Sequence, residues 1–571
     1  MAEKRKRADV VVIGLGAAGG TVVKPLAEAG LSVVGLEAGP RYTNRDFPLD
    51  EIRNDNRNWL GRLKFNQEIP TWRRSPGQKA GDPTRMGAIV TRMMNGVGGT
   101  SIHWTSQSWR FTDWNFRTRS QSEKRYGRGS IPSNSTVTDW PVSYDDLEPY
   151  YDRVEYLHGV SGKAGNIQGK KDPEGNIHES PRQREYPNPP LHKSGYMTMM
   201  ADALRKQGYD PFIGPSAVRS RQYEGMPGCT YCGFCTNAGC YNDAKATTML
   251  RGIPDAEETG NLEVIPNARA LRIEVDNDGR ATGVTFLRGG REVFQPARFV
   301  VLASYVYENT RLLLLSRSKA FPRGLANNAG QVGRHYMAHV YCGVNALFEG
   351  RKLNRFNGTG AQAICIDNLN GDNFDHKGLS FIGGGVVSAG HEAKPIATAT
   401  SVPEGVPRWG SEWKRWIAKN ANSIGGLFAQ TECLPYEDSF LDLDPTEKDP
   451  LGLPRIRVTY DIHQQESDRY DYIYAQLERM LKEMGASKTW VGFPKIPHPV
   501  NTHAYGGTRM GDDPETSVVN GFCIAHEVPN LAVLGASTFV TTSGYNPTET
   551  VMALAWRSGD HIAENFERLT S

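Results

Sequence analysis

The sequence predicts an α/β fold in which a Rossmann-like dinucleotide-binding domain is joined to a separate mixed-sheet substrate-binding domain. Three observations predict this fold. The first forty residues read as strand, glycine-rich turn, helix and strand. Residues 261–303 read as three further strands, and a helix follows them. The last seventy residues return to glycine-rich loops with one strand and one long helix, so the first domain is expected to be assembled from distant parts of the chain.

The length of 571 residues exceeds what one hydrophobic core usually supports. Two amphipathic helices are expected in the middle of the chain, over 143–160 and 466–485. Changes in composition divide the rest. We expect a dinucleotide-binding domain in three parts (1–111, 226–335 with a cysteine loop, and 501–571), an inserted substrate lobe at 112–225 and a substrate-binding domain at 336–500.

Composition excludes several classes of protein. The 66 basic and 63 acidic residues are dispersed and nearly balanced, which gives no reason to expect nucleic-acid binding. No run of 18 apolar residues exists, so no transmembrane helix is expected. The first residues, MAEKRKRADVVVIG, are basic but lack the apolar stretch of a secretory or twin-arginine signal, and none is expected there.

The first glycine-rich turn predicts a dinucleotide site. Gly14 permits the tight turn, Gly16 lets the backbone approach a pyrophosphate, and Gly19 lets the helix pack on the strand. Glu37 ends the second strand, where a carboxylate accepts hydrogen bonds from a ribose diol. The alternative is a glycine-rich turn without a ligand. Because no second strand-flanked copy of this motif occurs, one dinucleotide is favoured over two.

A second glycine-rich stretch, NGVGGTSIHWT, spans residues 95–105. Its glycines would let the backbone lie against a flat ring. His103 within it has two interpretations, a packed, hydrogen-bonded histidine or the attachment point of a covalently bound flavin.

Four of the eight cysteines fall within twelve residues. The spacing CxxCxxC with a fourth cysteine soon after suits thiolates around a compact iron–sulfur cluster. Zinc is less suited, since structural zinc ligands usually come from two separate knuckles. Buried cysteines with a disulfide are the remaining alternative. The four candidate ligands are Cys229, Cys232, Cys235 and Cys240, and the others, expected in the core, are Cys342, Cys365, Cys433 and Cys523.

Two residues near the end of the chain predict alcohol chemistry. His503 can accept a hydroxyl proton, and Asn546 can hold the same hydroxyl group. Each alone is unremarkable, but together with a dinucleotide fold they form a specific hypothesis. His335 and His339 are four residues apart, yet their segment reads as a strand without a third ligand, so no metal is expected there.

Together these residues resemble the glucose–methanol–choline (GMC) oxidoreductase family. Within it the chain is most similar to the branch of flavoprotein subunits of bacterial gluconate, sorbitol, fructose, 2-ketogluconate and glucoside dehydrogenases. The resemblance covers most of the chain, and the CTYCGFC loop is its most specific marker. The motifs that carry it are VVIGLGAAGG, LEAGP, NGVGGTSIHWTSQSWRF, PVSYDDLEPYYDRVE, CTYCGFCTNAGC, NDAKAT, GDNFDH, HAYGGTRMG and GYNPTETVMALA.

The resemblance implies FAD as the dinucleotide and assigns residues to it. His103 matches a position that carries a histidyl–flavin bond in several relatives, and His503 and Asn546 match the active-site base and its partner. Three cysteines are the likeliest cluster ligands, Cys232 being the least certain, and a [3Fe-4S] centre is as well suited as [4Fe-4S]. The remaining expected FAD contacts are Gly14, Gly16, Gly19, Glu37, Asn95, Gly98, Gly99, Thr100, Ala270, Gly535, Ala536, Ser537, Asn546, Pro547 and Thr548.

The resemblance also implies partners. Related complexes pass electrons to a cytochrome c subunit, and a small third subunit carries the export signal. A location on the periplasmic face of the cytoplasmic membrane is therefore expected, reached without a signal of its own, with a cytoplasmic enzyme as the alternative.

The expected activity is an FAD-dependent dehydrogenase that oxidises a secondary alcohol of a sugar, aldonate, polyol or glycoside. An oxidase that uses O₂, with a merely structural cysteine loop, is one alternative, and an inactive flavoprotein scaffold or electron carrier is another. Two departures from the family pattern, Ala270 in place of valine and the helix start YVYENTRLLLLS, advise against naming one substrate.

Overall fold

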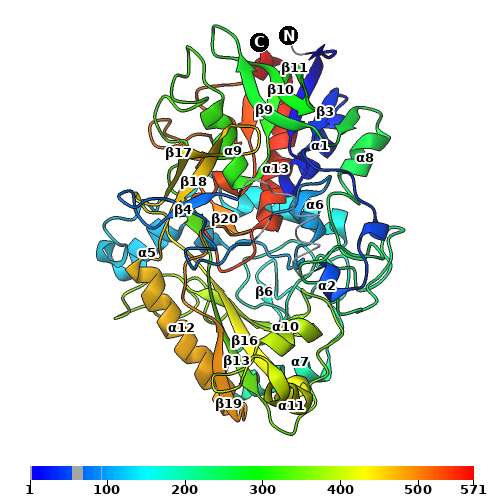
Figure 1. The fold of residues 1–571 in the computed structure, drawn as a ribbon, viewed down its shortest axis with the longest axis vertical. Coiled ribbons are helices and arrows are strands. Elements are labelled where there is room, and N and C mark those ends of the chain that lie inside the picture. Colours follow the sequence, from blue (N-terminus) through cyan, green and yellow to red (C-terminus); the bar gives the residue numbers. More distant parts are fainter. Residues whose placement is uncertain (1–2, 55–68, 92) are drawn as a thin grey trace.

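A computed structural model describes residues 3–54, 69–91 and 93–571. Figure 1 shows an elongated molecule with two lobes, one above the other, and both termini at the far end of the upper lobe. Within the described ranges, no helix combines the length and apolar character needed to cross a bilayer.

The upper lobe is built on a largely parallel sheet. β2 (Ala8–Ile13) lies between β3 (Val33–Leu36) and β11 (Arg291–Leu302), with β8 (Leu262–Ile265) beyond β3 and β21 (Leu531–Val533) beside β11. All of these neighbours run parallel. Their valine-rich runs are buried almost throughout, as strands covered on both faces require. The predicted strand–turn–helix–strand unit is confirmed.

β11 connects two kinds of sheet. Its first half pairs antiparallel with β10 (Ala281–Arg288), which pairs in turn with β9 (Arg269–Val275), and its second half lies parallel to β2. The run LEVIPNARALRIEV, expected as one strand, is two strands, β8 and β9. The chain turns between them at Asn267, whose φ is +53° and whose N–H donates to the carbonyl of Gly39.

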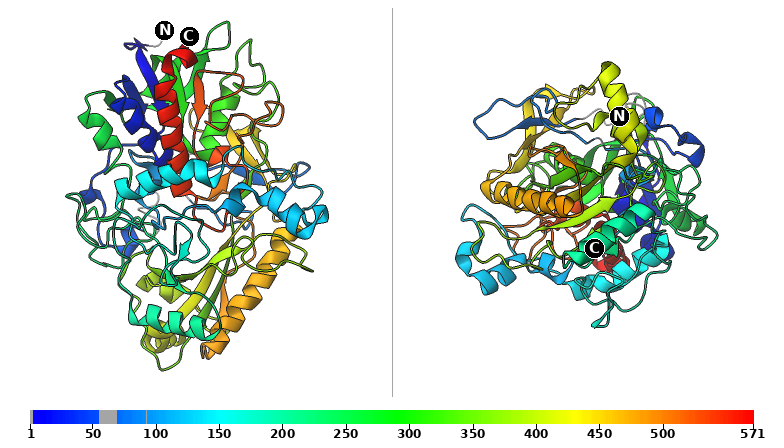
Figure 2. Two further views of the ribbon diagram at one scale, coloured as in Figure 1. Left: turned by 180° about the vertical axis from the view of Figure 1, so that it is seen from behind. Right: turned by 90° about the horizontal axis from the view of Figure 1, so that it is seen from below.

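Three helices pack against one another beside this sheet. α13 (Thr548–Glu564) contacts both α1 (Ala17–Glu28) and α6 (Tyr144–His158), and Figure 2 shows from behind that α6 crosses the lower end of α13. α13 and α1 approach closely, since a Cβ added at Gly559 would come within 2.6 Å of the ring of Pro25. The end of the chain is thereby packed against its beginning.

The lower lobe contains an antiparallel sheet in the order β19-β13-β16-β15-β14-β7. The expected helix of residues 466–485 is α12 (Gln464–Glu483), and it packs on the middle of this sheet. α7 (Gly195–Lys206), which the sequence reading missed, packs beside β14. The strands are β7 (Phe212–Ile213), β13 (Val340–Leu347), β14 (Ala363–Ile366), β15 (Gly385–Gly390), β16 (Ile424–Thr431) and β19 (Lys488–Phe493).

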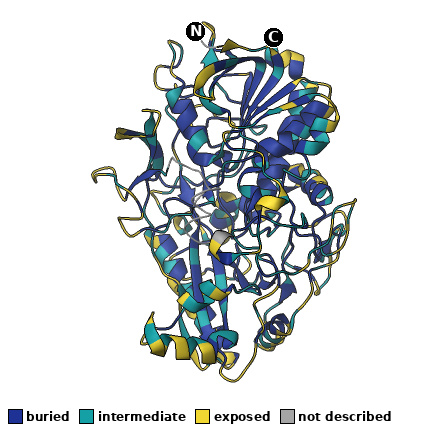
Figure 3. Ribbon diagram, turned by 45° about the vertical axis from the view of Figure 1, so that its right-hand side comes forward, coloured by how far each residue is buried: buried dark blue, intermediate teal, exposed yellow. Residues whose placement is uncertain are grey.

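A small mixed sheet lies at the side of the molecule. In it β18 (Pro454–Thr459) pairs parallel with β4 (Thr71–Arg73) and antiparallel with β17 (Phe440–Lys448). The two lobes have separate hydrophobic cores, and Figure 3 shows the buried residues gathered along the strands of each.

Candidate FAD and alcohol-oxidation site

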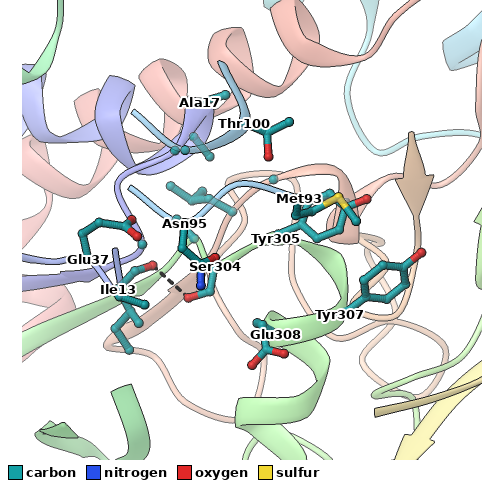
Figure 4. A pocket seen from close by; sticks show the side chains of 18 of the residues that line it. Ile13, Ala17, Glu37, Met93, Asn95, Thr100, Ser304, Tyr305, Tyr307 and Glu308 are labelled. Atoms are coloured by element: carbon teal, nitrogen blue, oxygen red, sulfur yellow. Dashed lines mark hydrogen bonds between the residues drawn. The ribbon is translucent and has the colours of Figure 1, made fainter. Parts of the chain in front are cut away.

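A cavity of about 230 Å³ opens at the carboxyl ends of the parallel strands, where ligands bind in doubly wound sheets. Figure 4 shows side chains from both glycine-rich stretches and from α9 (Tyr305–Leu315) turned toward it. Eleven of the residues expected to hold FAD line this cavity together: Gly14, Gly16, Glu37, Asn95, Gly99, Thr100, Ala270, Gly535, Ala536, Pro547 and Thr548.

The other expected contacts lie just outside the lining. Gly19 packs the helix on the turn, since a Cβ there would come within 1.8 Å of the carbonyl oxygen of Gly14. Gly98 has φ +105° and backs onto Met249. Ser537 and His103 are buried beside the cavity, His103 with 2% of its surface exposed.

The two glycine-rich loops meet backbone to backbone. A Cβ on Gly99 would lie 2.7 Å from the Cα of Gly16, and one on Gly14 would lie 2.8 Å from the carbonyl oxygen of Ala303. The amino end of α1 points into the gap, where its unpaired N–H groups favour a phosphate. This narrow, side-chain-free cradle fits the pyrophosphate of FAD.

Glu37 fixes the junction of these loops. Its carboxylate accepts hydrogen bonds from the backbone N–H groups of Leu15 (3.0 Å), Gly39 (2.9 Å) and Gly96 (3.0 Å). Burial raises the pKa of Glu37 to about 7, although these N–H groups oppose the shift. The residue expected to bind a ribose therefore also joins the first turn to the second glycine-rich stretch.

Sequence reasoning missed part of the lining. Tyr305, at the start of α9, has φ +78° and donates its hydroxyl proton to the carbonyl of Asn501. Glu308 and Arg311 from the same helix also face the cavity. The unusual YVYEN start of this helix was the available signal, because a non-glycine residue at positive φ is uncommon and concentrates at functional sites.

The structure brings His503 and Asn546 together. The Asn546 Nδ2 atom lies 3.4 Å from His503 Nε2, although 43 positions separate them in the chain. Thr502, the neighbour of His503, lines the cavity, so the pair lies at its edge. Burial lowers the pKa of His503 to about 4, which leaves a neutral imidazole able to accept a proton at physiological pH.

His335 and His339 have different surroundings, and only His339 lies at the site. His335 contacts Thr136 (2.8 Å) and Gln331 (3.3 Å), away from the site. His339 instead lies against His503, at 3.1 Å between their Nδ1 atoms. The sequence offered no sign of that contact, because the two histidines are 164 positions apart.

The loop of four cysteines is anchored from two sides. Glu392 accepts hydrogen bonds from the N–H groups of Cys235 (2.6 Å) and Thr236 (2.9 Å). Lys245 donates to the carbonyls of Cys235 (3.1 Å) and Trp104 (2.9 Å). Because Trp104 lines the dinucleotide cavity, the cysteine loop lies directly behind that cavity.

All four thiols are free and half-buried. Burial raises the pKa of Cys229 to about 12, and the electrostatic effect of the other three cysteines adds to the shift. The Cys229 Sγ atom accepts the N–H of Tyr231 at 3.3 Å. Among the described residues, no three His, Cys, Asp or Glu side chains converge closely enough to hold a metal ion. The four remaining cysteines are buried, as predicted.

Comparisons with known proteins agree on one family. The family model of GMC oxidoreductases matches residues 435–555. The gluconate 2-dehydrogenase flavoprotein of Pantoea cypripedii is 34% identical, with 99% of this chain and 95% of that protein aligned. The fructose dehydrogenase large subunit of Gluconobacter japonicus is 28% identical over the full length of both chains.

A further relative and a solved structure are also similar to this chain. The 2-methyl-1,2-propanediol dehydrogenase of Mycolicibacterium austroafricanum is 28% identical, covering 99% of this chain and 97% of that protein. Among solved structures, formate oxidase of Aspergillus oryzae matches with a TM-score of 0.60 at 16% identity over the full length of both chains, which shows a shared fold.

Proposed function

The chain belongs to the GMC oxidoreductase family and is an oxidoreductase acting on CH–OH groups, and from this premise we propose that it is an FAD-dependent dehydrogenase of a sugar, aldonate, polyol or glycoside. The observation that carries the proposal is the contact of His503 with Asn546 at the edge of the dinucleotide cavity.

The glycine cradle, Glu37 and the amino end of α1 would hold FAD, and bound FAD supplies the acceptor for the hydride that leaves the oxidised carbon. His503 accepts the hydroxyl proton at Nε2, and Asn546 donates its amide N–H to the same oxygen and so orients the alcohol. A positioned base contributes about 10²–10⁴-fold to the rate. Burial favours the neutral form of His503, which is the form that can accept the proton.

Replacement of the base tests this mechanism. In His503→Ala, anaerobic flavin reduction by substrate is expected to slow by about 10²–10⁴-fold, while FAD remains bound. His526→Ala is the control, because His526 contacts Ser517 rather than the site. Flavin reduction at the wild-type rate in His503→Ala would refute the assignment.

The substrate class rests on the names of the relatives, which act on gluconate, fructose and a diol. Anaerobic flavin reduction with gluconate, sorbitol, fructose, glucose and a glucoside would identify the substrate. Rapid reoxidation of the flavin by air would instead favour an O₂-using oxidase. If no compound on the panel bleached the flavin, an inactive scaffold or electron carrier would be the better description.

We further propose that the cysteine loop carries an iron–sulfur cluster that passes electrons to an external acceptor. Four free, half-buried cysteines within twelve residues, on one anchored loop behind the cavity, support this, and the cluster would draw its ligands from Cys229, Cys232, Cys235 and Cys240. Cys235→Ser is expected to lose iron and the reduction of an external acceptor, with flavin reduction by substrate unchanged. Cys342→Ala, in the lower core, is the matched control. Wild-type protein without iron and sulfide would refute the proposal.

Two further features are part of the proposal. His103 forms a covalent bond to the flavin, which leaves the denatured protein yellow, and His103→Ala would release the flavin on denaturation.

The chain works with a cytochrome c subunit and a small signal-bearing subunit at the periplasmic face of the membrane. One relative is the large subunit of a fructose dehydrogenase, which supports such an assembly.

A further inference from the structure

The side of His503 that faces away from Asn546 is enclosed by polar groups. Its Nδ1 atom lies 3.1 Å from His339 Nδ1 and 3.2 Å from the hydroxyl of Tyr341. Asn501 completes the enclosure, since its side chain contacts both Tyr341 and the backbone of His503.

The hydrogen bonds of Asn501 fix the direction of the others. The His503 backbone N–H, which can only donate, lies 2.9 Å from Asn501 Oδ1, so this atom is the amide oxygen. Tyr341 lies 3.0 Å from the same oxygen and must therefore donate its hydroxyl proton to it. The amide nitrogen of Asn501 is left to donate to the carbonyl of His339, 3.4 Å away.

The tautomer of His503 follows. Tyr341 donates its only hydroxyl proton to Asn501, so its oxygen can only accept a hydrogen bond from His503. The proton of the neutral His503 imidazole is therefore on Nδ1. Nε2 then carries the lone pair, and this is the atom 3.4 Å from Asn546. The hydrogen bonds thus place the proton-accepting nitrogen on the side of the site.

The same logic extends to His339. Its Nδ1 atom faces the N–H of His503 and accepts it, so its own proton is on Nε2, which lies 2.9 Å from the hydroxyl of Tyr505. The backbone of Ser543 and the side chain of Gln430 are further hydrogen-bond partners of His339. His339, Tyr505 and Asn501 have essentially no exposed surface. Burial, and next the neighbouring His503, hold the pKa of His339 well below its ordinary value, so His339 stays neutral when His503 becomes charged.

The backbone locks these side chains in register. β12 (Met337–Ala338) pairs with β20 (Ala504–Tyr505), and the N–H of His339, the next residue after β12, donates to the carbonyl of His503 at 3.3 Å. The pairing places His339 and His503 opposite each other, directly beyond the ends of the two short strands. A side chain next to paired strands is held more firmly than one on a free loop.

We propose that His339 and Tyr341 are positioning residues that hold His503 in the Nδ1–H tautomer and accept its Nδ1–H while Nε2 carries the substrate proton. This inference rests on the proposed role of His503 as the base. Both residues act through His503, and neither lies on the side of Asn546.

The experiment compares variants of the FAD-loaded enzyme in which one acceptor is removed. His339→Ala and Tyr341→Phe are expected to lower the rate of flavin reduction at saturating substrate by about 10-fold or more each, with little change in KM, because the base rather than substrate binding is affected. His339→Asn, which restores an acceptor oxygen, is expected to recover part of the rate. His498→Ala is the control, since His498 packs on the Tyr341 ring and has no direct contact with His503 among the described residues.

The pH profile separates positioning from general damage. The groups around the pair are Tyr305 from α9, Tyr341 from β13, Tyr505 from β20, His498 from the preceding loop and Arg469 from α12. Only the neutral base is active, so the acid limb of the rate profile follows the pKa of His503, which burial lowers to about 4. Opening the enclosure to water in His339→Ala is expected to move this limb upward, toward 6.5.

The outcomes are distinguishable. If His503→Ala keeps wild-type activity, the proposed function fails. If His503→Ala is inactive while His339→Ala and Tyr341→Phe keep the wild-type rate and acid limb, the positioning role is overturned. Should His339→Ala fail to retain FAD, Tyr341→Phe and His339→Asn, which alter fewer atoms, decide the question by the same two readouts.

Discussion

At the scale of single residues, the glycines of the first turn belong to one sequence motif but have different roles. Gly19 is required by the fold, because a Cβ atom at this position would lie only 1.8 Å from the carbonyl oxygen of Gly14. Gly16 is not crowded by protein, since the nearest atom to its Cβ position is the Cα of Gly99 at 3.9 Å. Its φ of −78° is also ordinary for alanine. The space at Gly16 is therefore kept for the cofactor it lines.

Two alanine substitutions test this division. Gly16→Ala is expected to leave the thermal midpoint of the apoprotein within a few degrees of wild type but to weaken FAD binding about tenfold or more, near 1.4 kcal/mol. Gly19→Ala is expected to destabilise the apoprotein by about 1–3 kcal/mol, because backbone must move to admit the methyl group. Thermal unfolding of apoprotein and flavin titration measure both effects. Equal losses of stability in the two variants would contradict the assignment.

His503, Asn546 and the glycines of the cavity were predictable from sequence because each lies in a recognisable local pattern. His339 and Tyr341 were not, since their relation to His503 exists only after β12 and β20 pair across more than 160 residues. Tyr305 lies between these cases. The helix start that contains it departs from the family pattern, but its positive φ and its contact with Asn501 are seen only in the structure.

At the scale of elements, apolar strands were easier to predict than polar helices. β2, β3 and β11 are continuous apolar runs, so their positions followed from composition. α7 was missed because it lies in a segment rich in charge and proline, although Ser194 caps it by accepting the N–H of Met197. α6 was found because its helical spacing is regular.

α6 is also fixed by a buried ion pair. Arg110 donates from Nε and Nη2 to the two carboxylate oxygens of Glu155, both at 2.8 Å, and from Nη1 to Glu148 at 2.9 Å. All three residues are more than nine-tenths buried. On the exposed side of the same helix, Arg153 pairs with Asp560 of α13 at 2.6 Å.

The two pairs are expected to differ in their contribution to stability. Arg110→Met leaves the Glu155 charge buried with fewer partners and is expected to reduce the free energy of unfolding by about 3 kcal/mol or more. Arg153→Met removes a solvent-screened pair and is expected to cost less than about 1 kcal/mol. Urea unfolding of the two variants measures this difference. A loss in Arg153→Met as large as that in Arg110→Met would show that burial is not the deciding factor.

At the scale of the whole molecule, buried titratable groups link stability to pH. Burial lowers the pKa of several histidines, among them His158, to about 3, and His391 and His498, to about 4. Burial raises the pKa of three carboxyls to about 7, those of Glu37, Glu179 and Glu432. Below pH 6.5 the unfolded chain binds histidine protons that the fold excludes, so stability falls as the pH falls. Between pH 4.5 and 7 the fold retains carboxyl protons that the unfolded chain releases, so stability falls as the pH rises.

These effects oppose each other between pH 4.5 and 6.5. Below pH 4.5 the histidines act in the same direction as carboxylates whose pKa the fold lowers, such as Asp444, at about 2. The urea midpoint of the holoenzyme is therefore expected to change less from pH 6.5 to 4.5 than from pH 4.5 to 3.5, where it falls by up to about 1.4 kcal/mol per pH unit for each histidine. His158→Leu removes one such group from the molecule and is expected to make the acid limb shallower and, because one opposing group is lost, to make stability rise as the pH falls from 6.5 to 4.5, relative to wild type. An acid limb that starts at pH 6.5, or one that is unchanged in His158→Leu, would show that other groups govern the acid stability of the two lobes.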